Sequence, residues 1–235
     1  MGCSTDITRL DLPARPRNAR ARRSLTLLLA GAMAAVASAQ ATDLIISEYL
    51  EGSSNNKYIE IYNGTAAGIN LANYQLRLYA NGSGTVTTTG APAMTGTLAA
   101  GATVVYKNSL AALAVPGEIT NSAVAFNGDD AIDLYNTVTT STVDIIGNIG
   151  CDPGTQWTGT GGRSTLNKTL VRKANICTGV TSNPGWPPCT FPTLDSQWDV
   201  FNVDDATHLG SHTMLCGPTV NFDLASSAAL ESAGT

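Results

Sequence analysis

Two glutamates in one hairpin-like segment have the residue type needed for acid–base chemistry on a substrate. Runs with strand character, Ile45 to Tyr49 and Tyr58 to Tyr62, flank a polar connection, which is the signature of a β-hairpin. Glu48 and Glu60 could face each other across the two strands, as the paired carboxyl groups of a retaining glycosidase do at ~5 Å. Nothing else in the sequence outlines a sugar-sized cleft, so solvated strand positions or partners of basic side chains are the more ordinary interpretation.

The polar connection between these strands is the best candidate for a binding loop. It extends from Glu51 to Lys57 and contains Asn55 and Asn56. Polar loops on a rigid β framework commonly carry recognition, and the alternative is a merely solvated hairpin loop. The candidate binding residues of the whole segment are thus Glu48, Glu51, Asn55, Asn56, Lys57 and Glu60.

Two other groups contain residue types that bind metals. Asp129 and Asp130 precede a strand-like run and could bind calcium, but the sequence has no DxDxDG loop, which favours a turn capped by an Asp side chain. His208 and His212 have the spacing of zinc enzymes, although Leu209 occupies the position of the required glutamate, which favours a structural role. The sequence therefore predicts no cofactor, with calcium as the alternative.

The first 39 residues have the pattern of an export signal. Five arginines between residues 15 and 23 precede an apolar run from residue 25 to residue 36, and residues 37–39, Ala-Ser-Ala, form a cleavage site. This run is shorter than the ~20 residues that cross a bilayer. We expect residues 1–39 to be a signal peptide, the cleaved chain to have no transmembrane segment, and the protein to be secreted or held at the cell surface. An uncleaved anchor is the alternative.

Removal of this segment leaves an acidic chain. Six of the 13 Lys and Arg and two of the 18 Asp and Glu lie in it, so the rest carries 7 basic and 16 acidic residues. Such a surface repels phosphate backbones, which disfavours direct binding to nucleic acid. The expected partner is an extracellular protein or polymer whose identity the sequence does not give.

Four cysteines follow the signal segment, an even number that favours two disulfides in an exported protein. The stretch between Cys177 and Cys189 contains three prolines. We therefore predict a loop closed by these two cysteines and a second bond between Cys151 and Cys216 that ties the end of the domain to its body. A metal site is the alternative, but no CxxC pair is present.

Short strand-like segments separated by turn residues recur along the chain. In the run from Tyr58 to Tyr62, Ile59 and Ile61 alternate with the other residues, which predicts one buried face. A single short helix is expected over residues 109–114. This pattern predicts an all-β protein with an immunoglobulin-like β-sandwich. Further candidate strands are residues 74–79, 85–89, 102–106, 132–135, 143–145 and 168–173.

Three tryptophans lie in the second half of the chain. Trp157, Trp186 and Trp198 could form a platform for a carbohydrate or peptide. Packing beneath long loops is the more ordinary explanation for each of them.

Five segments, in order, resemble the lamin-tail domain of secreted bacterial proteins. The resemblance covers residues 42–215 and implies an immunoglobulin-like sandwich that works as a non-catalytic module. Bacterial relatives are often joined to extracellular nuclease or phosphatase domains, or to other surface modules. The segments are ISEYLEGSSNNKYIEIYNGT (46–65), FNGDDAIDLYN (126–136), VDIIGNIGCDPGTQW (143–157), TLVRK (169–173) and LGSH (209–212).

Residues 219–235 resemble the opening strand of a Calx-beta module, so we expect a truncated first strand or a disordered tail there. Taken together, the patterns predict a non-catalytic binding or accessory module of a larger secreted or surface protein. The alternative is an accessory domain of a secreted nuclease or phosphoesterase whose catalytic domain lies beyond residue 235.

Overall fold

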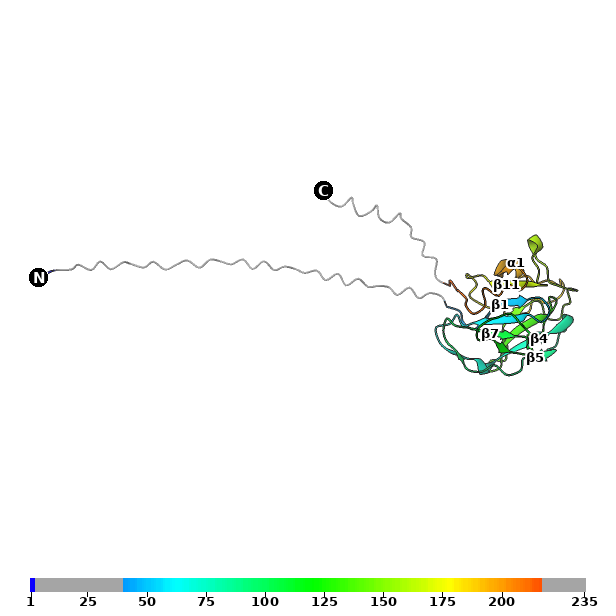
Figure 1. Cartoon of the computed structure of the whole chain (residues 1–235), viewed down its shortest axis with the longest axis horizontal. Coiled ribbons are helices and arrows are strands. Elements are labelled where there is room, and N and C mark those ends of the chain that lie inside the picture. Colours follow the sequence, from blue (N-terminus) through cyan, green and yellow to red (C-terminus); the bar gives the residue numbers. More distant parts are fainter. Residues whose placement is uncertain (3–39, 217–235) are drawn as a thin grey trace, which may run out of the picture. The chain divides into compact units, whose positions relative to one another are not determined.

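The computed structural model describes residues 1–2 and 40–216 (Figure 1). Residues 3–39 of the expected signal peptide and the whole Calx-beta-like segment lie outside the described residues, so both stay predictions. None of the helices in the described part of the chain has the length and hydropathy needed to span a bilayer.

The larger sheet has six strands in the order β12-β11-β1-β2-β7-β8. All neighbouring strands are antiparallel except β7 and β8, which are parallel. The hairpin expected from the sequence is the centre of this sheet. Its strands are β12 (Trp198–Phe201), β11 (Lys168–Arg172), β1 (Ile45–Glu51), β2 (Lys57–Tyr62), β7 (Thr103–Lys107) and β8 (Ile119–Thr120).

The second sheet has four strands in the order β10-β9-β4-β5, and a separate two-stranded ladder pairs β3 with β6. The only α-helix among the described residues is α1 (Leu194–Gln197). The predicted all-β, immunoglobulin-like sandwich is confirmed. The remaining elements are β10 (Ser141–Ile146), β9 (Ala131–Asn136), β4 (Tyr74–Tyr79), β5 (Thr88–Thr89), β3 (Ile69–Asn70), β6 (Thr97–Leu98), and the 3-10 turns η1 (Leu71–Asn73), η2 (Ala80–Gly82) and η3 (Thr160–Gly162).

The prediction of a helix over residues 109–114 is wrong, because this segment has a turn at residues 109–110 and is otherwise irregular. The side chain of Asn108 accepts a hydrogen bond from the amide of Leu110, and its backbone carbonyl accepts one from the amide of Ala111. Local side-chain bonds of this kind compete with a helix.

The main hydrophobic core lies between the two sheets. Ile59 and Ile61 of β2 face Leu76 and Leu134 of the second sheet, and all four side chains are fully buried in one cluster. Burial of each such side chain contributes about 1.5–3 kcal/mol. This core is the fixed framework that positions the loops.

The hairpin strands are buried on both faces, so the single buried face predicted for β2 is wrong. On the outer face Leu50, Tyr58 and Val105 form a second hydrophobic cluster. The C-terminal segment 202–216, named the strap here, covers this face and contributes Leu209 to the cluster. The alternation of residues within a strand cannot predict that a segment much later in the sequence will cover the outer face of that strand.

The disulfides join Cys151 to Cys189 and Cys177 to Cys216, with Cα–Cα distances of 5.6 and 5.8 Å. The predicted pairing is therefore wrong. The amide of Leu215 donates to the carbonyl of Ala174, which places residue 216 beside residue 177. For this bond, a backbone contact between segments far apart in the sequence brings the two cysteines together.

Candidate functional site

The connection between β1 and β2 is held by a buried ion pair. Nζ of Lys57 lies 2.9 Å from Oε1 of Glu51 and also donates to the carbonyl of Gly52. The second oxygen of Glu51 accepts a hydrogen bond from the amide of Asn167. Both charged side chains are almost fully buried. These two predicted binding residues thus stabilise the fold and are not available to a ligand.

Asn56 is also used within the protein. Its Oδ1 accepts a hydrogen bond from the amide of Ala112 at 2.9 Å, and its Nδ2 donates to Asp204 of the strap at 3.1 Å. Asn55 is exposed, together with Ser53 and Ser54. Asn55 is therefore the one predicted binding residue of this loop that lies open to solvent.

Glu48 and Glu60 are directly opposite each other in the β1–β2 register, as expected. Both are about 99% buried beneath the strap, so the interpretation as solvated positions is wrong. Glu60 accepts hydrogen bonds from Oγ of Ser47 and from the amide of Gly210, each at 2.6 Å. A glycosidase pair needs access to a sugar, and this pair is covered by protein.

The carboxyl group of Glu48 has no hydrogen-bond partner among the described residues. Burial, with the nearby charges of Glu60 and Asp205, raises the pKa of Glu48 to about 9. The side chain is therefore protonated at neutral pH. Glu48 therefore makes the stability of the fold depend on pH, and its buried carboxyl group does not contact solvent.

Asp130 caps a turn, as the sequence favoured. Its two carboxylate oxygens accept hydrogen bonds from the amides of Asn81 and Asn127, at 2.8 and 2.7 Å. Asp129, next to it, is partly buried. No group of three or more His, Cys, Asp or Glu within residues 40–216 is arranged to hold a metal ion.

The two histidines pack the strap against the sheet. The ring of His208 lies 4.4 Å from that of Phe201, and the ring of His212 lies 5.0 Å from that of Tyr62. Burial lowers the pKa of His212 to about 4. These contacts support the structural role favoured from the sequence.

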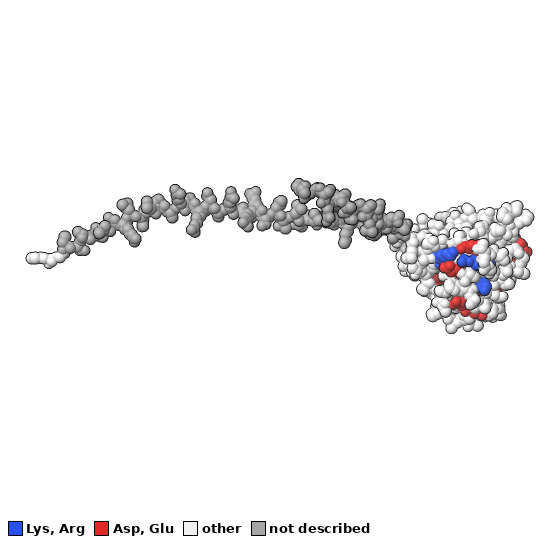
Figure 2. Space-filling model, turned by 90° about the horizontal axis from the view of Figure 1, so that it is seen from above, with Lys and Arg blue, Asp and Glu red and all other residues white. Residues whose placement is uncertain are grey.

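Most positive charges of residues 40–216 are engaged within the protein. Five of the seven Lys and Arg in this range form ion pairs, and Lys173 donates to two backbone carbonyls. Figure 2 shows blue atoms beside red ones, surrounded by uncharged surface. Little positive charge is left for a phosphate backbone. The pairs are Lys57–Glu51, Arg77–Asp133, Lys107–Glu118, Arg163–Asp195 and Arg172–Asp144.

A different segment presents its polar and aromatic groups to solvent. Residues 176–194, named the stapled loop here, contain no charged residue. Both disulfides hold this loop, through Cys177 and Cys189. The amide of Val180 donates to the buried Asp144 at 2.8 Å. A side chain at Gly179 would come within 2.2 Å of the carbonyl oxygen of Val143, so only glycine allows the loop to lie this close to β10.

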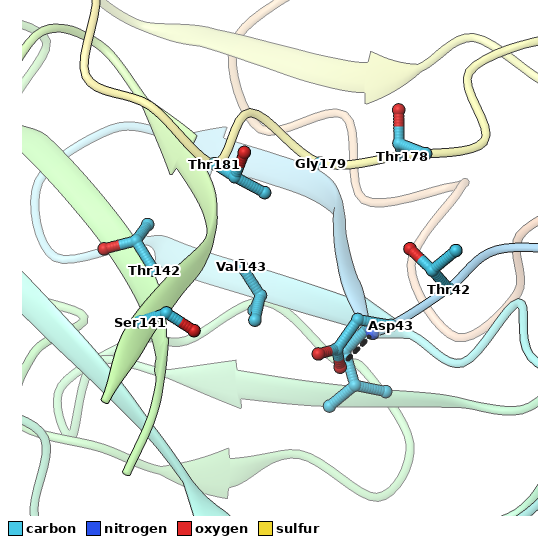
Figure 3. A pocket seen from close by; sticks show the side chains of 9 residues that line it. Thr42, Asp43, Ser141, Thr142, Val143, Thr178, Gly179 and Thr181 are labelled. Carbon is cyan, nitrogen blue, oxygen red and sulfur yellow. Dashed lines mark hydrogen bonds between the residues drawn. The ribbon is translucent and has the colours of Figure 1, made fainter. Parts of the chain in front are cut away.

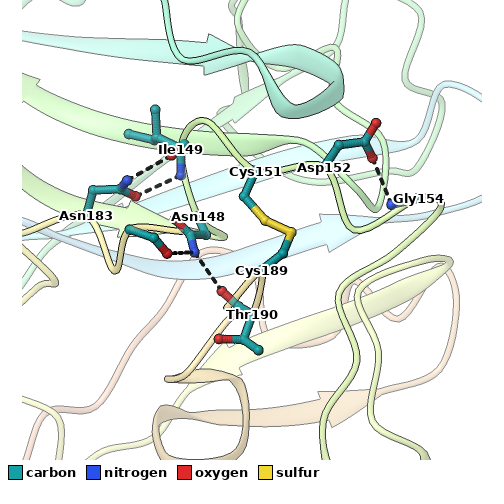
Figure 4. Close-up of a disulfide and its surroundings, with 9 residues drawn as sticks. Asn148, Ile149, Cys151, Asp152, Gly154, Asn183, Cys189 and Thr190 are labelled. Atoms are coloured by element: carbon teal, nitrogen blue, oxygen red, sulfur yellow. Dashed lines mark hydrogen bonds between the residues drawn. A yellow bond between two sulfur atoms is a disulfide. The ribbon is translucent and has the colours of Figure 1, made fainter. Parts of the chain in front are cut away.

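Two asparagines fix the far end of the stapled loop, as Figure 4 shows. Nδ2 of Asn148 donates to the carbonyls of Gly185 and Thr190, at 2.7 and 3.1 Å. The side chain of Asn183 bonds both the amide and the carbonyl of Ile149. With the nearby disulfide, these bonds hold the loop tip on the turn that follows β10.

Trp186 lies at this tip and is 66% exposed, whereas Trp157 and Trp198 are buried. The packing explanation therefore holds for two of the three tryptophans and is wrong for Trp186. The sequence feature that could have indicated the exposure of Trp186 is a charge-free run in which this tryptophan stands between a glycine and a proline.

Two hollows border the stapled loop. The first, of about 330 Å³, lies between the loop, β10 and the segment before β1, which all contribute hydroxyl groups (Figure 3). The second, of about 440 Å³, lies beside Cys189 and is lined by Asp152, Gln156 and three threonines. Each hollow holds one carboxylate among neutral polar groups, since Asp43 lines the first.

Comparison with known families gives one match. Residues 37–150 match the model of the Lamin Tail Domain, which is a non-catalytic immunoglobulin-like family. No curated protein matched the chain. The match ends before β11 and β12, although β11 pairs directly with β1. The match and the observed fold together support a lamin tail domain in this part of the chain.

Proposed function

We propose that this chain is a non-catalytic binding module of a larger secreted or cell-surface protein. One observation carries the proposal: Glu48, Glu60 and Asp130 are buried within the fold, whereas the stapled loop presents neutral groups to solvent. Rigid sandwiches commonly bind partners through such loops.

The disulfides and the pattern of the first 39 residues support a location outside the cytoplasm. Two disulfides within residues 40–216 are typical of an oxidising compartment. The arginine-rich start and the small-residue cleavage pattern of residues 1–39 agree with export.

Assistance to a nuclease or phosphoesterase domain is the alternative and rests on the resemblance alone. The ion-paired basic side chains argue against direct contact with the phosphate backbone. Under this alternative the catalytic groups would lie in another domain.

Hydrolysis assays test the proposed function. The exported chain, incubated with DNA and with p-nitrophenyl phosphate in the presence of Mg²⁺ or Ca²⁺, is expected to give no turnover above buffer. Calcium is also expected to leave the melting temperature unchanged, since ligand binding to the folded state would raise it. Turnover that disappears in Asp130→Asn would contradict the proposal.

A further inference from the structure

The exposed indole of Trp186 is carried by a turn whose backbone is conformationally restricted. Pro184, Pro187 and Pro188 surround it in the sequence, and proline restricts the backbone. The ties from Asn148 and Asn183 hold the same turn in place. A partner that docks here would therefore meet a preorganised aromatic surface and would lose little binding free energy to loop ordering.

The chemistry around this tryptophan is neutral. No Asp, Glu, Lys or Arg occurs from residue 176 to residue 194, so a charged partner finds no complementary charge on the loop. The available groups are an aromatic face, hydroxyls and amides. An apolar face with polar groups at its edge fits a sugar ring, which has C–H groups on its face and hydroxyls around its rim.

The two hollows supply hydrogen-bonding groups from residues that lie before and after Trp186 in the sequence. Thr181 of the first hollow precedes the tryptophan by five residues, and Cys189 of the second follows it by three. At ~3.5 Å per residue these spans are at most ~17 and ~10 Å. Both hollows therefore lie within the reach of an oligosaccharide that stacks on Trp186 and extends along the loop.

The carboxylates in the hollows are placed as hydrogen-bond acceptors. Oδ1 of Asp43 is fixed by the amide of Leu44 at 2.7 Å and by the hydroxyl of Tyr74 at 2.6 Å. Oδ1 of Asp152 accepts a hydrogen bond from the amide of Gly154 at 2.7 Å. Such oriented carboxylates accept from sugar hydroxyls and repel anionic polymers.

We propose that the stapled loop binds a neutral polysaccharide, with Trp186 as the stacking surface and the two hollows as polar subsites. This inference rests on the proposed function, because it names the partner class of the same module. A proline-rich peptide and an anionic polymer are the competing partners that the test separates.

The test measures retention of the exported full chain on cellulose, chitin, xylan and mannan, with heparin and a polyproline peptide as competitors of other chemistry. Binding to at least one neutral polysaccharide is expected, and Trp186→Ala should weaken it at least about tenfold. Trp186→Phe should restore part of the loss. The matched control is Leu110→Ala, which changes another apolar side chain of 69% exposure and should bind like the wild type.

Each outcome decides the proposal. Binding that is unchanged in Trp186→Ala, binding only to heparin or polyproline, or no retention on any of the four polysaccharides would overturn it. Retention that survives in Trp186→Ala would still support a binding module that uses another surface. Hydrolysis of the test polymers would instead contradict the non-catalytic function.

Discussion

The β1–β2 connection and the stapled loop both contain several polar side chains but use them differently. In the first, Glu51 and Asn56 bond other parts of the fold, and Lys57 is paired with Glu51. In the second, the backbone is fixed by neighbouring side chains and Trp186 faces solvent. Polar content alone does not identify a binding loop. What matters is whether its side chains already have partners.

The largest expected effect is on stability, at the β1–β2 connection. Glu51→Ala would leave the ammonium of Lys57 buried without a counter-charge and the amide of Asn167 without an acceptor. The expected cost is about 3–5 kcal/mol in the free energy of unfolding, measured by chemical denaturation. Asn55→Ala, at the exposed tip, should change stability by less than about 0.5 kcal/mol.

Glu51→Ala also tests whether the β1–β2 connection takes part in binding. Below its unfolding transition, Glu51→Ala should retain wild-type affinity for the partner, because the connection only supports the fold. A loss of binding by a folded Glu51→Ala protein would show that the β1–β2 connection takes part in recognition.

The next effect concerns the two disulfides. Replacing Cys151 and Cys189 together by serine should cost ~2–4 kcal/mol, because the bond closes a long loop of the unfolded chain. It should also weaken binding several-fold, since the tip that carries Trp186 loses one of its ties.

The matched control is the Cys177 and Cys216 double serine variant. Its loss of stability should be similar, but binding should persist because the ties from Asn148 and Asn183 remain. A non-reducing peptide map that found Cys177 joined to Cys189 would contradict this account of the loop.

The smallest of the three effects depends on pH and lies beneath the strap. The folded pKa of Glu48, about 9, exceeds the ordinary value of 4.5. Between these values the folded protein binds more protons than the unfolded one, so stability falls as pH rises. Glu48→Gln has no proton to lose and should be about 1–3 kcal/mol more stable than the wild type at pH 8.

Near pH 4 the advantage of Glu48→Gln should vanish. His212 has the opposite sign, because a pKa lowered to about 4 gives stability that is lost as pH falls below 6.5. Denaturation curves between pH 7 and pH 9 therefore isolate Glu48. A Glu48→Gln protein less stable than the wild type at pH 8 would mean that this carboxylate is ionised and paired.

The sequence predicted the framework better than the site. The alternating apolar residues of β2 and the recurring short strand-like runs predicted the sandwich, and the hairpin pattern of residues 45–62 predicted that Glu48 and Glu60 face each other. The strap over these glutamates could not be predicted, since it comes from a segment about 150 residues later in the chain. The disulfide pairing failed for the same reason.

The exposed tryptophan shows a second limit of sequence reasoning. Trp157, Trp186 and Trp198 all lie in the second half of the chain, and only three-dimensional contacts separate the buried two from the exposed one. The charge-free run around Trp186 was visible in the sequence. Its meaning depends on the ties from Asn148 and Asn183, which no local pattern indicates.

The central claim is that recognition takes place at the stapled loop and not at the β1–β2 connection. Hydrogen–deuterium exchange of the exported chain, with and without the polysaccharide that retains it, tests this claim most directly. Added protection in residues 178–190, with none in residues 51–57, is the predicted result. Protection confined to residues 51–57 would contradict the account.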